Sequence, residues 1–266
     1  MTSVGAWLAN SHLTQRDADI LIYEVTGLSR SRVLTHPETE LSATHLAHLN
    51  HLKDLLAQGT PLAYVLGEWE FWGLTFDLTA ATLIPRPDTE LLVGTALEQV
   101  PRHARVLELG TGSGAIAVAL ATARPDLLLT ATDLSTDALQ VAQKNALRHD
   151  VDVTFIASDW FENIHGRWQA IIANPPYVAA NDPHLLKLGH EPRTALVSGQ
   201  DGLDALRHIV KHAGNHLCPP NLLLVEHGYD QGDAVRNLFV SHGFSEVATR
   251  RDLGENERVT LGRRLT

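Results

Sequence analysis

From Pro85 onward, short apolar runs alternate with amphipathic stretches, and this alternation restricts the fold more than any other feature of the sequence. A short apolar run bounded by turn residues is typical of a buried strand in a parallel sheet. Strands that alternate with helical stretches indicate an α/β fold with a doubly wound parallel sheet. We therefore predict five strands in this part of the chain, at 105–109, 127–132, 151–156, 169–173 and 221–226. Two further runs, at 244–250 and 257–263, lie on either side of Gly254 and predict an antiparallel pair at the sheet edge.

The first 60 residues show helical periodicity and no strand pattern. Thr14 fits an N-cap and Gly27 a C-cap for a helix at 15–26. A leucine-rich stretch predicts a second helix at 39–58. Helices of this length are marginally stable alone, so we expect residues 1–60 to pack together as a small helical bundle.

Residues 61–84 combine aromatic and β-branched residues with Gly67 and Gly73. This composition is typical of a β-hairpin. The sequence thus predicts three segments: a helical domain at 1–60, a hairpin linker at 61–84 and an α/β domain at 85–266.

The first predicted strand of the α/β part continues directly into a glycine-rich turn, Gly110-Thr111-Gly112-Ser113-Gly114, and a helical run follows it. A strand, a glycine turn and a helix bring backbone amides and a helix N-terminus close to an anionic ligand group. Asp133 ends the next strand at about the spacing from which a carboxylate accepts hydrogen bonds from a ribose. The pattern fits a nicotinamide dinucleotide as well as S-adenosylmethionine, so it predicts a cofactor site without choosing between them.

The residues Asn174-Pro175-Pro176-Tyr177 come directly after the apolar run 169–173, and would lie at the carboxyl end of that strand. Two prolines fix the backbone and remove two N–H donors, which leaves carbonyl groups free to accept hydrogen bonds. Asn174 adds a side-chain carbonyl and Tyr177 an aromatic face, a combination that suits a planar NH2 group. The alternative interpretation is a plain strand exit capped by Asn-Pro.

Asp159 and Trp160 follow the third predicted strand in the same way. The glycine turn, Asp133, Asp159-Trp160 and the Asn174 turn therefore fall at the ends of consecutive strands. In a parallel sheet those ends form one rim, where open α/β sheets bind ligands. Trp160 taken alone could equally be a core residue.

The overall composition narrows the function classes. The formal net charge of −10 disfavours a large nucleic-acid footprint, because phosphate binding depends on clustered Lys and Arg.

The single cysteine, Cys218, excludes an internal disulfide and fits a reducing compartment. Fifteen histidines occur without an HExxH pattern or cysteine partners, so we predict no functional metal. No run approaches the length that crosses a bilayer, and we expect a cytoplasmic monomer.

These motifs resemble those of class I S-adenosylmethionine-dependent methyltransferases, and most closely the protein-(glutamine-N5) methyltransferases that modify release factors. The resemblance includes segments outside the shared methyltransferase core, among them Leu83-Ile84-Pro85-Arg86-Pro87-Asp88-Thr89-Glu90, Glu191-Pro192-Arg193 and Gly228-Tyr229-Asp230-Gln231-Gly232. It implies a Rossmann-like, seven-stranded methyltransferase sheet. It also implies methylation of the glutamine N5 in the Gly-Gly-Gln motif of class-1 peptide-chain release factors, with the N-terminal helices docking that partner.

The same resemblance implies roles for individual residues. The methionine end of S-adenosylmethionine would be held by Glu108, Gly110, Thr111, Gly112, Ser113 and Gly114, its ribose by Asp133, and its adenine by Asp159 and Trp160. The substrate amide would bind Asn174 and the Pro175 carbonyl beside the cofactor, with Pro176 and Tyr177 in the same turn. Arg86 and Glu90 would lie near the substrate channel, or form a structural ion pair instead.

Two positions depart from the family pattern, because His190 stands where an aromatic residue is expected and His227 where an aliphatic one is. Three other activities stay open from the sequence. A glutamine methyltransferase acting on a ribosomal protein would share the core motifs. An adenine-N6 nucleic-acid methyltransferase would bind an NH2 group of the same shape, but normally needs a basic, base-flipping surface. A nicotinamide-dependent dehydrogenase would use the glycine turn and leave the Asn174 turn unexplained.

Overall fold

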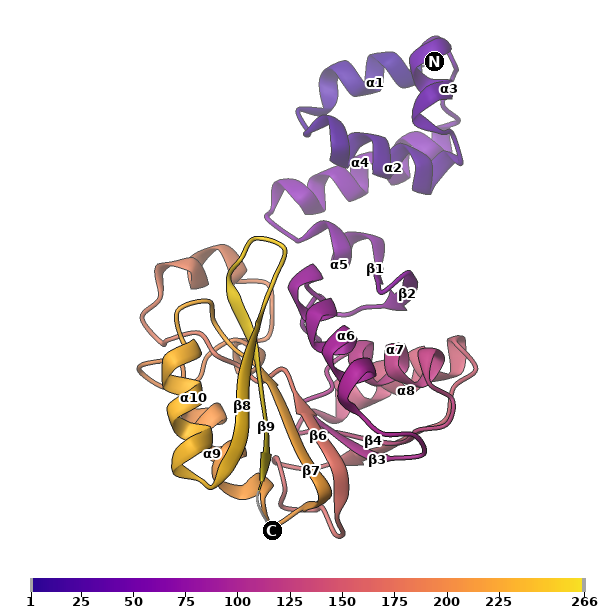
Figure 1. Cartoon of the computed structure of the whole chain (residues 1–266). Coiled ribbons are helices and arrows are strands. Elements are labelled where there is room, and N and C mark those ends of the chain that lie inside the picture. The colour runs from indigo at the N-terminus through magenta and orange to yellow at the C-terminus, as the bar shows by residue number, and fades with distance from the viewer. Residues whose placement is uncertain (1, 265–266) are drawn as a thin grey trace. The chain divides into compact units, whose positions relative to one another are not determined.

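The computed structural model describes residues 2–264 (Figure 1). Contacts within the chain separate two compact units, one up to Gly67 and the other from Glu68 onward. The named elements of the first unit between residues 2 and 67 are helices, with one isolated β-bridge between Ser3 and Glu40. The helices are α1 (Val4–Ser11), α2 (Gln15–Thr26), α3 (Arg30–Thr35), α4 (Ala43–Ala57) and α5 (Leu62–Leu66). Their apolar faces share one core, whose buried members include Trp7, Leu21, Ile22 and Leu49.

The capping residues set the bounds of the two helices that the sequence predicts in this unit. Helix α2 spans the predicted residues: Thr14 Oγ1 accepts from the backbone N–H of Asp17 at 3.1 Å, and Gly27 ends the helix with φ of 71°. Helix α4 begins at Ala43 rather than at residue 39, because the Ser42 side chain caps it. A local side-chain hydrogen bond therefore decides each start.

The prediction of a hairpin throughout 61–84 is wrong for residues 62–66, which form α5. Pro61 precedes this helix and Gly67 ends it with φ of 77°, so the segment has helix-start and helix-stop residues at both ends. The hairpin itself is short and consists of β1 (Glu68–Phe71) and β2 (Leu74–Asp77). Its two turn residues, Trp72 and Gly73, both have positive φ, as a two-residue hairpin turn requires.

All seven strands predicted for the α/β part are present, and they form one sheet in the order β5-β4-β3-β6-β7-β9-β8. Strands β3 to β7 run parallel, whereas β9 is antiparallel to both β7 and β8. The strands are β3 (Arg105–Leu109), β4 (Leu128–Asp133), β5 (Val153–Ala157), β6 (Trp168–Ala173), β7 (Leu217–Glu226), β8 (Phe244–Arg251) and β9 (Glu257–Arg264). The antiparallel pair thus lies at the sheet edge, as predicted.

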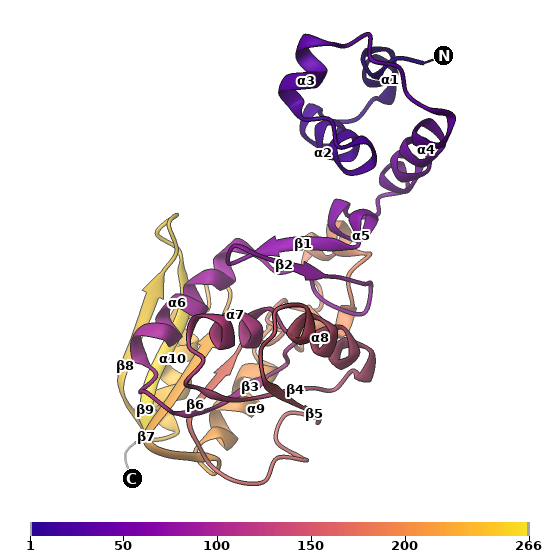
Figure 2. The ribbon, with the colours of Figure 1, turned by 90° about the vertical axis from the view of Figure 1, so that its right-hand side faces the viewer.

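Helices cover both faces of this sheet (Figure 1). One face packs against α6 (Glu90–Gln99), α7 (Ala115–Ala123) and α8 (Thr136–Arg148), and the other against α9 (Asp204–Ala213) and α10 (Gly232–Ser241). Successive strand residues alternate between the two cores: Ala170 and Ile172 belong to the first, Ile171 and Ala173 to the second. The β1–β2 hairpin lies alongside α8 (Figure 2). Three short 3-10 helices complete the unit, at Pro87–Thr89, Pro183–Leu188 and Arg193–Ala195.

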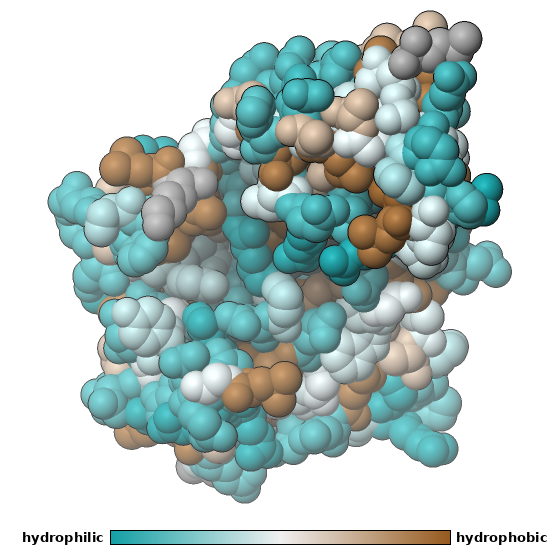
Figure 3. All heavy atoms as spheres, turned by 90° about the horizontal axis from the view of Figure 1, so that it is seen from above, coloured by the Kyte–Doolittle hydropathy of each residue, from teal (hydrophilic) through white to brown (hydrophobic). Residues whose placement is uncertain are grey.

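The face of the molecule in Figure 3 is largely hydrophilic, and apolar residues interrupt it in scattered groups. Scattered apolar residues of this kind are normal for a folded chain. None of the helices between residues 2 and 264 combines the length and the apolarity that crossing a bilayer requires.

Candidate active site

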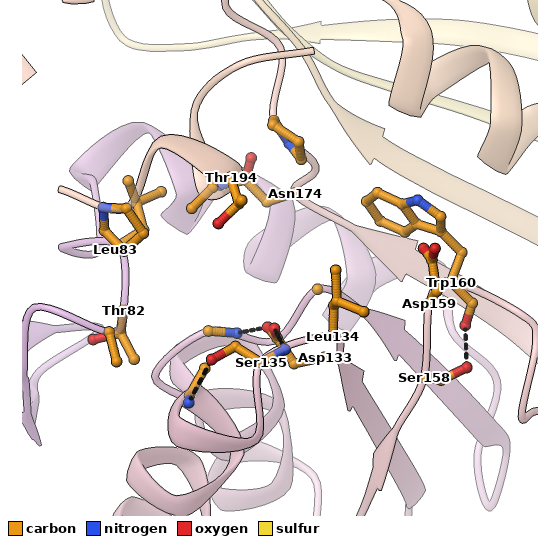
Figure 4. Close-up of a pocket in the computed structure, with 17 residues that line it drawn as sticks. Thr82, Leu83, Asp133, Leu134, Ser135, Ser158, Asp159, Trp160, Asn174 and Thr194 are labelled. Carbon is orange, nitrogen blue, oxygen red and sulfur yellow. Dashed lines mark hydrogen bonds between the residues drawn. The ribbon is translucent and has the colours of Figure 1, made fainter.

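A cavity of about 340 Å³ lies at the carboxyl ends of β3, β4, β5 and β6, where the sequence predicts a ligand-binding rim (Figure 4). Five of the residues that the sequence assigned to a cofactor line it: Gly110, Gly112, Asp133, Asp159 and Trp160. Asn174 and Pro176 also line it, so the cofactor and substrate motifs meet in one space. The remaining lining residues are Ala81, Thr82, Leu83, Leu134, Ser135, Ala138, Ser158, Pro192, Thr194 and Ala195. A pocket of this size can enclose a small organic molecule.

The glycine turn adopts a backbone conformation that only glycine accepts easily. Gly110, Gly112 and Gly114 have φ values of 71°, 55° and 82°. A Cβ on Gly114 would also lie 3.0 Å from the Cβ of Ala142 on α8. Strain and crowding together require glycine at the start of α7.

Asp133 links the glycine turn to the end of β4. Its carboxylate accepts from the backbone N–H of Gly112 at 2.8 Å and from that of Ser135 at 2.9 Å. Each carboxylate oxygen has a second lone pair, so both can accept a further hydrogen bond from a ligand. Asp133 therefore shapes the loop as well as lining the cavity.

The buried side chain of Asn145 fastens the turn from behind. Its Nδ2 donates to the Ser113 carbonyl at 2.8 Å and to the Asp77 carbonyl at 3.0 Å, while its Oδ1 accepts from Asp77 N–H at 2.8 Å. One amide thus joins α8, the hairpin and the glycine turn. Asn145 is not predictable from the sequence, since a single asparagine on an amphipathic helix gives no signal of a buried role.

Glu108 is fully buried beneath the turn, at the end of β3. Its Oε2 accepts from the Thr111 hydroxyl at 2.8 Å, and its Oε1 has no hydrogen-bond partner among residues 2–264. The pKa of Glu108 is raised to about 8, chiefly by burial and in part by nearby Asp133, while the Thr111 hydroxyl and the backbone N–H of Ala117 oppose the shift. A cationic group close to Oε1 would stabilise the ionised form of this carboxyl.

Trp160 contributes an aromatic wall (Figure 4). Its ring is close to Gly110, since a Cβ on that glycine would lie 3.8 Å from the indole. The backbone of Trp160 is left-handed, with φ of 45°, and the Ser158 hydroxyl donates to its carbonyl at 3.0 Å. A bulky residue held in this conformation is uncommon and marks a constrained turn.

Asn174 lines the cavity, and its Nδ2 donates to the Thr89 hydroxyl at 3.1 Å. Tyr177 belongs to the same turn but does not line the cavity; its hydroxyl donates to Oε1 of buried Glu226 at 3.3 Å. Pro175 is also absent from the lining, although its neighbours on both sides belong to it. The structure therefore fixes the two ends of the motif by contacts to the interior of the α/β unit.

Arg86 and Glu90 do not line the cavity, and each has a partner in the α/β unit. Arg86 forms an ion pair with buried Glu191, which also accepts from Ile84 N–H at 3.2 Å. This pair ties together the segments of Leu83 and Pro192, both of which do line the cavity. Glu90 accepts from the backbone N–H of Trp72 at 2.9 Å and so holds the hairpin turn. Proximity of either residue to a substrate channel stays a prediction.

Of the two departures from the family pattern, His227 is fully buried and His190 is exposed. His227 Nδ1 lies 2.9 Å from the Gly228 carbonyl and so carries the proton, while Nε2 accepts from the Thr260 hydroxyl at 2.8 Å. Burial lowers the pKa of His227, which keeps the ring neutral. The histidine is accommodated as a core residue.

Several lining residues were missed by sequence analysis, including Thr82, Leu83, Ser135 and Thr194. Ser135 lies two residues after Asp133 at a strand end, so its place on the rim could have been predicted from that position. The other three come from segments outside the strand–turn–helix units (Figure 4). These residues belong to two segments, one at Thr82 and Leu83 and one at Thr194. Only the family resemblance, which includes Leu83 and Glu191-Pro192-Arg193, indicated that these segments matter.

Two family models match the chain. Residues 7–67 match the PrmC N-terminal domain and residues 87–191 match the methyltransferase small domain. Among solved structures, a methyltransferase from Pyrococcus furiosus superposes on 85% of this chain and 100% of its own, with a TM-score of 0.58 and 16% identity. That identity supports the fold alone, and the fold is the methyltransferase type of α/β sheet.

Curated relatives are far more similar in sequence. The release factor glutamine methyltransferase of Yersinia pestis is 45% identical, over 98% of this chain and 96% of that protein. The enzyme of the same name from Escherichia coli (strain K12) is 44% identical, over 96% of this chain and 94% of that protein. Identity of this extent covers the helical unit and the α/β unit alike. The chain belongs to the release factor glutamine methyltransferase family.

Proposed function

We propose that this enzyme transfers a methyl group from S-adenosylmethionine to the side-chain amide nitrogen of the glutamine in the Gly-Gly-Gln motif of class-1 release factors. The observation that carries the proposal is the orientation of Asn174 in the cavity wall. Because its Nδ2 is bound to Thr89, its Oδ1 is the end left to accept a hydrogen from a substrate NH2 group. Family membership supports S-adenosylmethionine over a nicotinamide cofactor and a glutamine amide over adenine.

The residues of the cavity fit S-adenosylmethionine. The glycine turn would hold its methionine part. Glu108 lies beneath this turn and does not line the cavity, but its Oε1 has no hydrogen-bond partner of ordinary length among the described residues and suits an ammonium group brought against it. Asp133 would accept from the ribose hydroxyls through its remaining lone pairs, and Asp159 with Trp160 would hold the adenine. When bound, the cofactor supplies an electrophilic methyl group on a sulfonium.

The protein's own part in the reaction is to orient the acceptor and stabilise developing charge. Asn174 Oδ1 and the Pro175 carbonyl would accept the two hydrogens of the substrate NH2, which fixes the nitrogen and favours the positive charge that develops on it. One of these hydrogens leaves as a proton during or after the transfer, which restores a neutral amide. Burial raises the pKa of Tyr177, and its hydroxyl donates to Glu226, so its phenol stays protonated. Tyr177 therefore does not act as a base, and since it does not line the cavity, its packing beside the substrate amide stays a prediction.

We further propose that the helical unit docks the release factor and that Arg86 and Glu90 border the path of the substrate loop. The match of residues 7–67 to the PrmC N-terminal domain supports the first point. The second rests on the ion pair of Arg86 with Glu191, the neighbour of cavity-lining Pro192, and on the position of Glu90 directly after Thr89, whose hydroxyl bonds Asn174.

The proposed function is tested by transfer of labelled methyl from S-adenosylmethionine to four acceptors. They are a class-1 release factor, the same factor with its Gly-Gly-Gln glutamine changed to alanine, a ribosomal-protein mixture and duplex DNA. Label on the intact factor alone is the expected result. Label on the ribosomal proteins or on DNA would replace the proposed substrate, and equal labelling of the altered factor would exclude the glutamine.

Replacing Asp133 with alanine is expected to weaken S-adenosylmethionine binding about tenfold or more, since it removes the ribose acceptor and releases Gly112 N–H. Titration calorimetry measures the change. Asp133→Asn keeps one acceptor oxygen and should lose less affinity. Unchanged affinity in the alanine variant would remove Asp133 from the ribose site.

A further inference from the structure

The carboxyl ends of β6 and β7 place Asn174 next to a buried carboxyl group. The strands are parallel and Ala173 pairs with Val225, so the following residues, Asn174 and Glu226, occupy neighbouring positions. Asn174 and Glu226 each come two residues after Ile172 and Leu224, whose side chains lie in the same core. Residues two apart on a strand point to the same face of the sheet, so all four share that face. Glu226 is fully buried and does not line the cavity. Any effect it has on the substrate must pass through another residue.

Thr89 lies between Asn174 and Glu226. Its hydroxyl accepts from Asn174 Nδ2 at 3.1 Å, and it also lies beside the Glu226 carboxylate. Glu226 Oε1 accepts from the Tyr177 hydroxyl at 3.3 Å, whereas Oε2 has no hydrogen-bond partner of ordinary length among the described residues. The charged groups that face Glu226 are Asp88 and Arg258. These contacts form one chain of polar groups from the cavity wall to the interior.

We propose that Glu226 and Thr89 are positioning residues that determine which end of the Asn174 amide faces the cavity. A hydroxyl has one hydrogen to donate, and an ionised carboxylate can only accept. The Thr89 hydrogen is therefore directed to Glu226, and the Thr89 lone pairs face Asn174. Asn174 must then turn its NH2 to Thr89 and its Oδ1 to the cavity, which is the orientation that accepts a substrate N–H. This inference rests on the proposed function for its choice of substrate group.

The opposite polarity would prevent the bound substrate amide from aligning for methyl transfer. A neutral group in place of the Glu226 carboxylate can donate to Thr89, so the Thr89 hydrogen becomes free to bond Asn174 Oδ1. The Asn174 NH2 would then face the NH2 of the substrate, and two donors would meet without an acceptor. Burial raises the pKa of Glu226 to about 7, while the Thr89 and Tyr177 hydroxyls oppose that shift. Protonation of Glu226 at lower pH would have the same effect as neutral substitution.

The test compares Glu226→Gln, Thr89→Val and Thr89→Ser in the full-length protein, with a class-1 release factor as acceptor. We expect Glu226→Gln and Thr89→Val to lower kcat about tenfold or more, with KM and cofactor affinity within about twofold, because only the orientation of Asn174 changes. Thr89→Ser keeps the hydroxyl and should retain activity within about threefold. The kcat of the unaltered enzyme should rise as pH passes through about 7, and Glu226→Gln should lack that rise.

A second readout does not depend on the substrate. The side-chain NH2 signal of Asn174 in an amide NMR spectrum is identified by its loss in Asn174→Ala. Thr89→Val and Glu226→Gln should shift this signal and speed its hydrogen exchange, while Thr89→Ser should not. Unchanged kcat and an unchanged Asn174 signal in Glu226→Gln would overturn the proposal. If the unaltered enzyme fails to methylate the release factor, the proposed function fails, and the NMR comparison still decides the role of Glu226.

Discussion

Replacing Asn174 with alanine is expected to lower methyl transfer about a hundredfold or more, because the side chain supplies one of two acceptors that orient the substrate NH2. Cofactor affinity should change little, since Asp133, Trp160 and the glycine turn stay in place. Single-turnover methylation of a release factor measures the loss, and calorimetry with S-adenosylmethionine measures the affinity. A fall in kcat without a matching fall in affinity is the signature of an acceptor that acts on the substrate.

Two variants serve as controls for this prediction. Asn181→Ala makes the same substitution at an exposed position a few residues along the chain and should leave turnover unchanged. Asn174→Asp keeps an oxygen facing the cavity but loses the donor to Thr89, so an intermediate rate is expected. Full activity in Asn174→Ala would remove the residue from the reaction and would undermine the proposed chemistry of the whole turn.

Replacing Asn145 with alanine is expected to reduce the free energy of unfolding of the α/β unit by about 2 to 4 kcal/mol. The change leaves the Asp77 N–H, the Asp77 carbonyl and the Ser113 carbonyl without their shared partner in the interior. Unpartnered backbone groups are costly where water does not reach them, and of these three bonds the one to Ser113 is buried and the two to Asp77 are partly buried. Denaturant unfolding of the full-length protein, followed by tryptophan fluorescence, measures the loss.

The matched control for Asn145 lies on the same helix. Gln143 is exposed, so Gln143→Ala should shift stability by less than about 0.5 kcal/mol. Asn145→Ala should also weaken S-adenosylmethionine binding, because Ser113 belongs to the glycine turn. A variant as stable as the unaltered protein would show that water or a local shift replaces the three hydrogen bonds.

Much of the α/β unit follows from local sequence patterns. Apolar runs such as 169–173 predicted buried strands, because a strand covered on both faces must be apolar throughout. Residues at strand ends then predicted the rim, since parallel strands bring their carboxyl ends to one edge. Asp133, Trp160 and Asn174 line one cavity for that reason. The N-cap at Thr14 is equally local, and α2 begins where the sequence predicts.

The errors and omissions arise where distant residues decide. Residues 62–66 carry aromatic and β-branched side chains typical of strands, yet form α5, because Pro61 and Gly67 provide helix ends and their apolar side chains join the helical core. Local propensity is too weak to resist such packing. The family resemblance supplied the activity and the residue roles, which no periodicity in the chain contains.

Local sequence patterns are sufficient to predict the seven strands of the sheet, the glycine turn and the residues at the strand ends, but not α1, α3 or α5. Which strand-end residues face the cavity, and how they are held, depends on contacts between distant segments. Asn145 and Ser113 are far apart in the chain, as are Thr89 and Asn174, yet each pair is joined by a side-chain hydrogen bond. A side-chain hydrogen bond forms only where donor and acceptor meet at the right distance and angle. Because Asn, Ser and Thr occur throughout the sequence, the sequence does not show which of them will meet. Their pairing is fixed only when the sheet and its helices have brought them together.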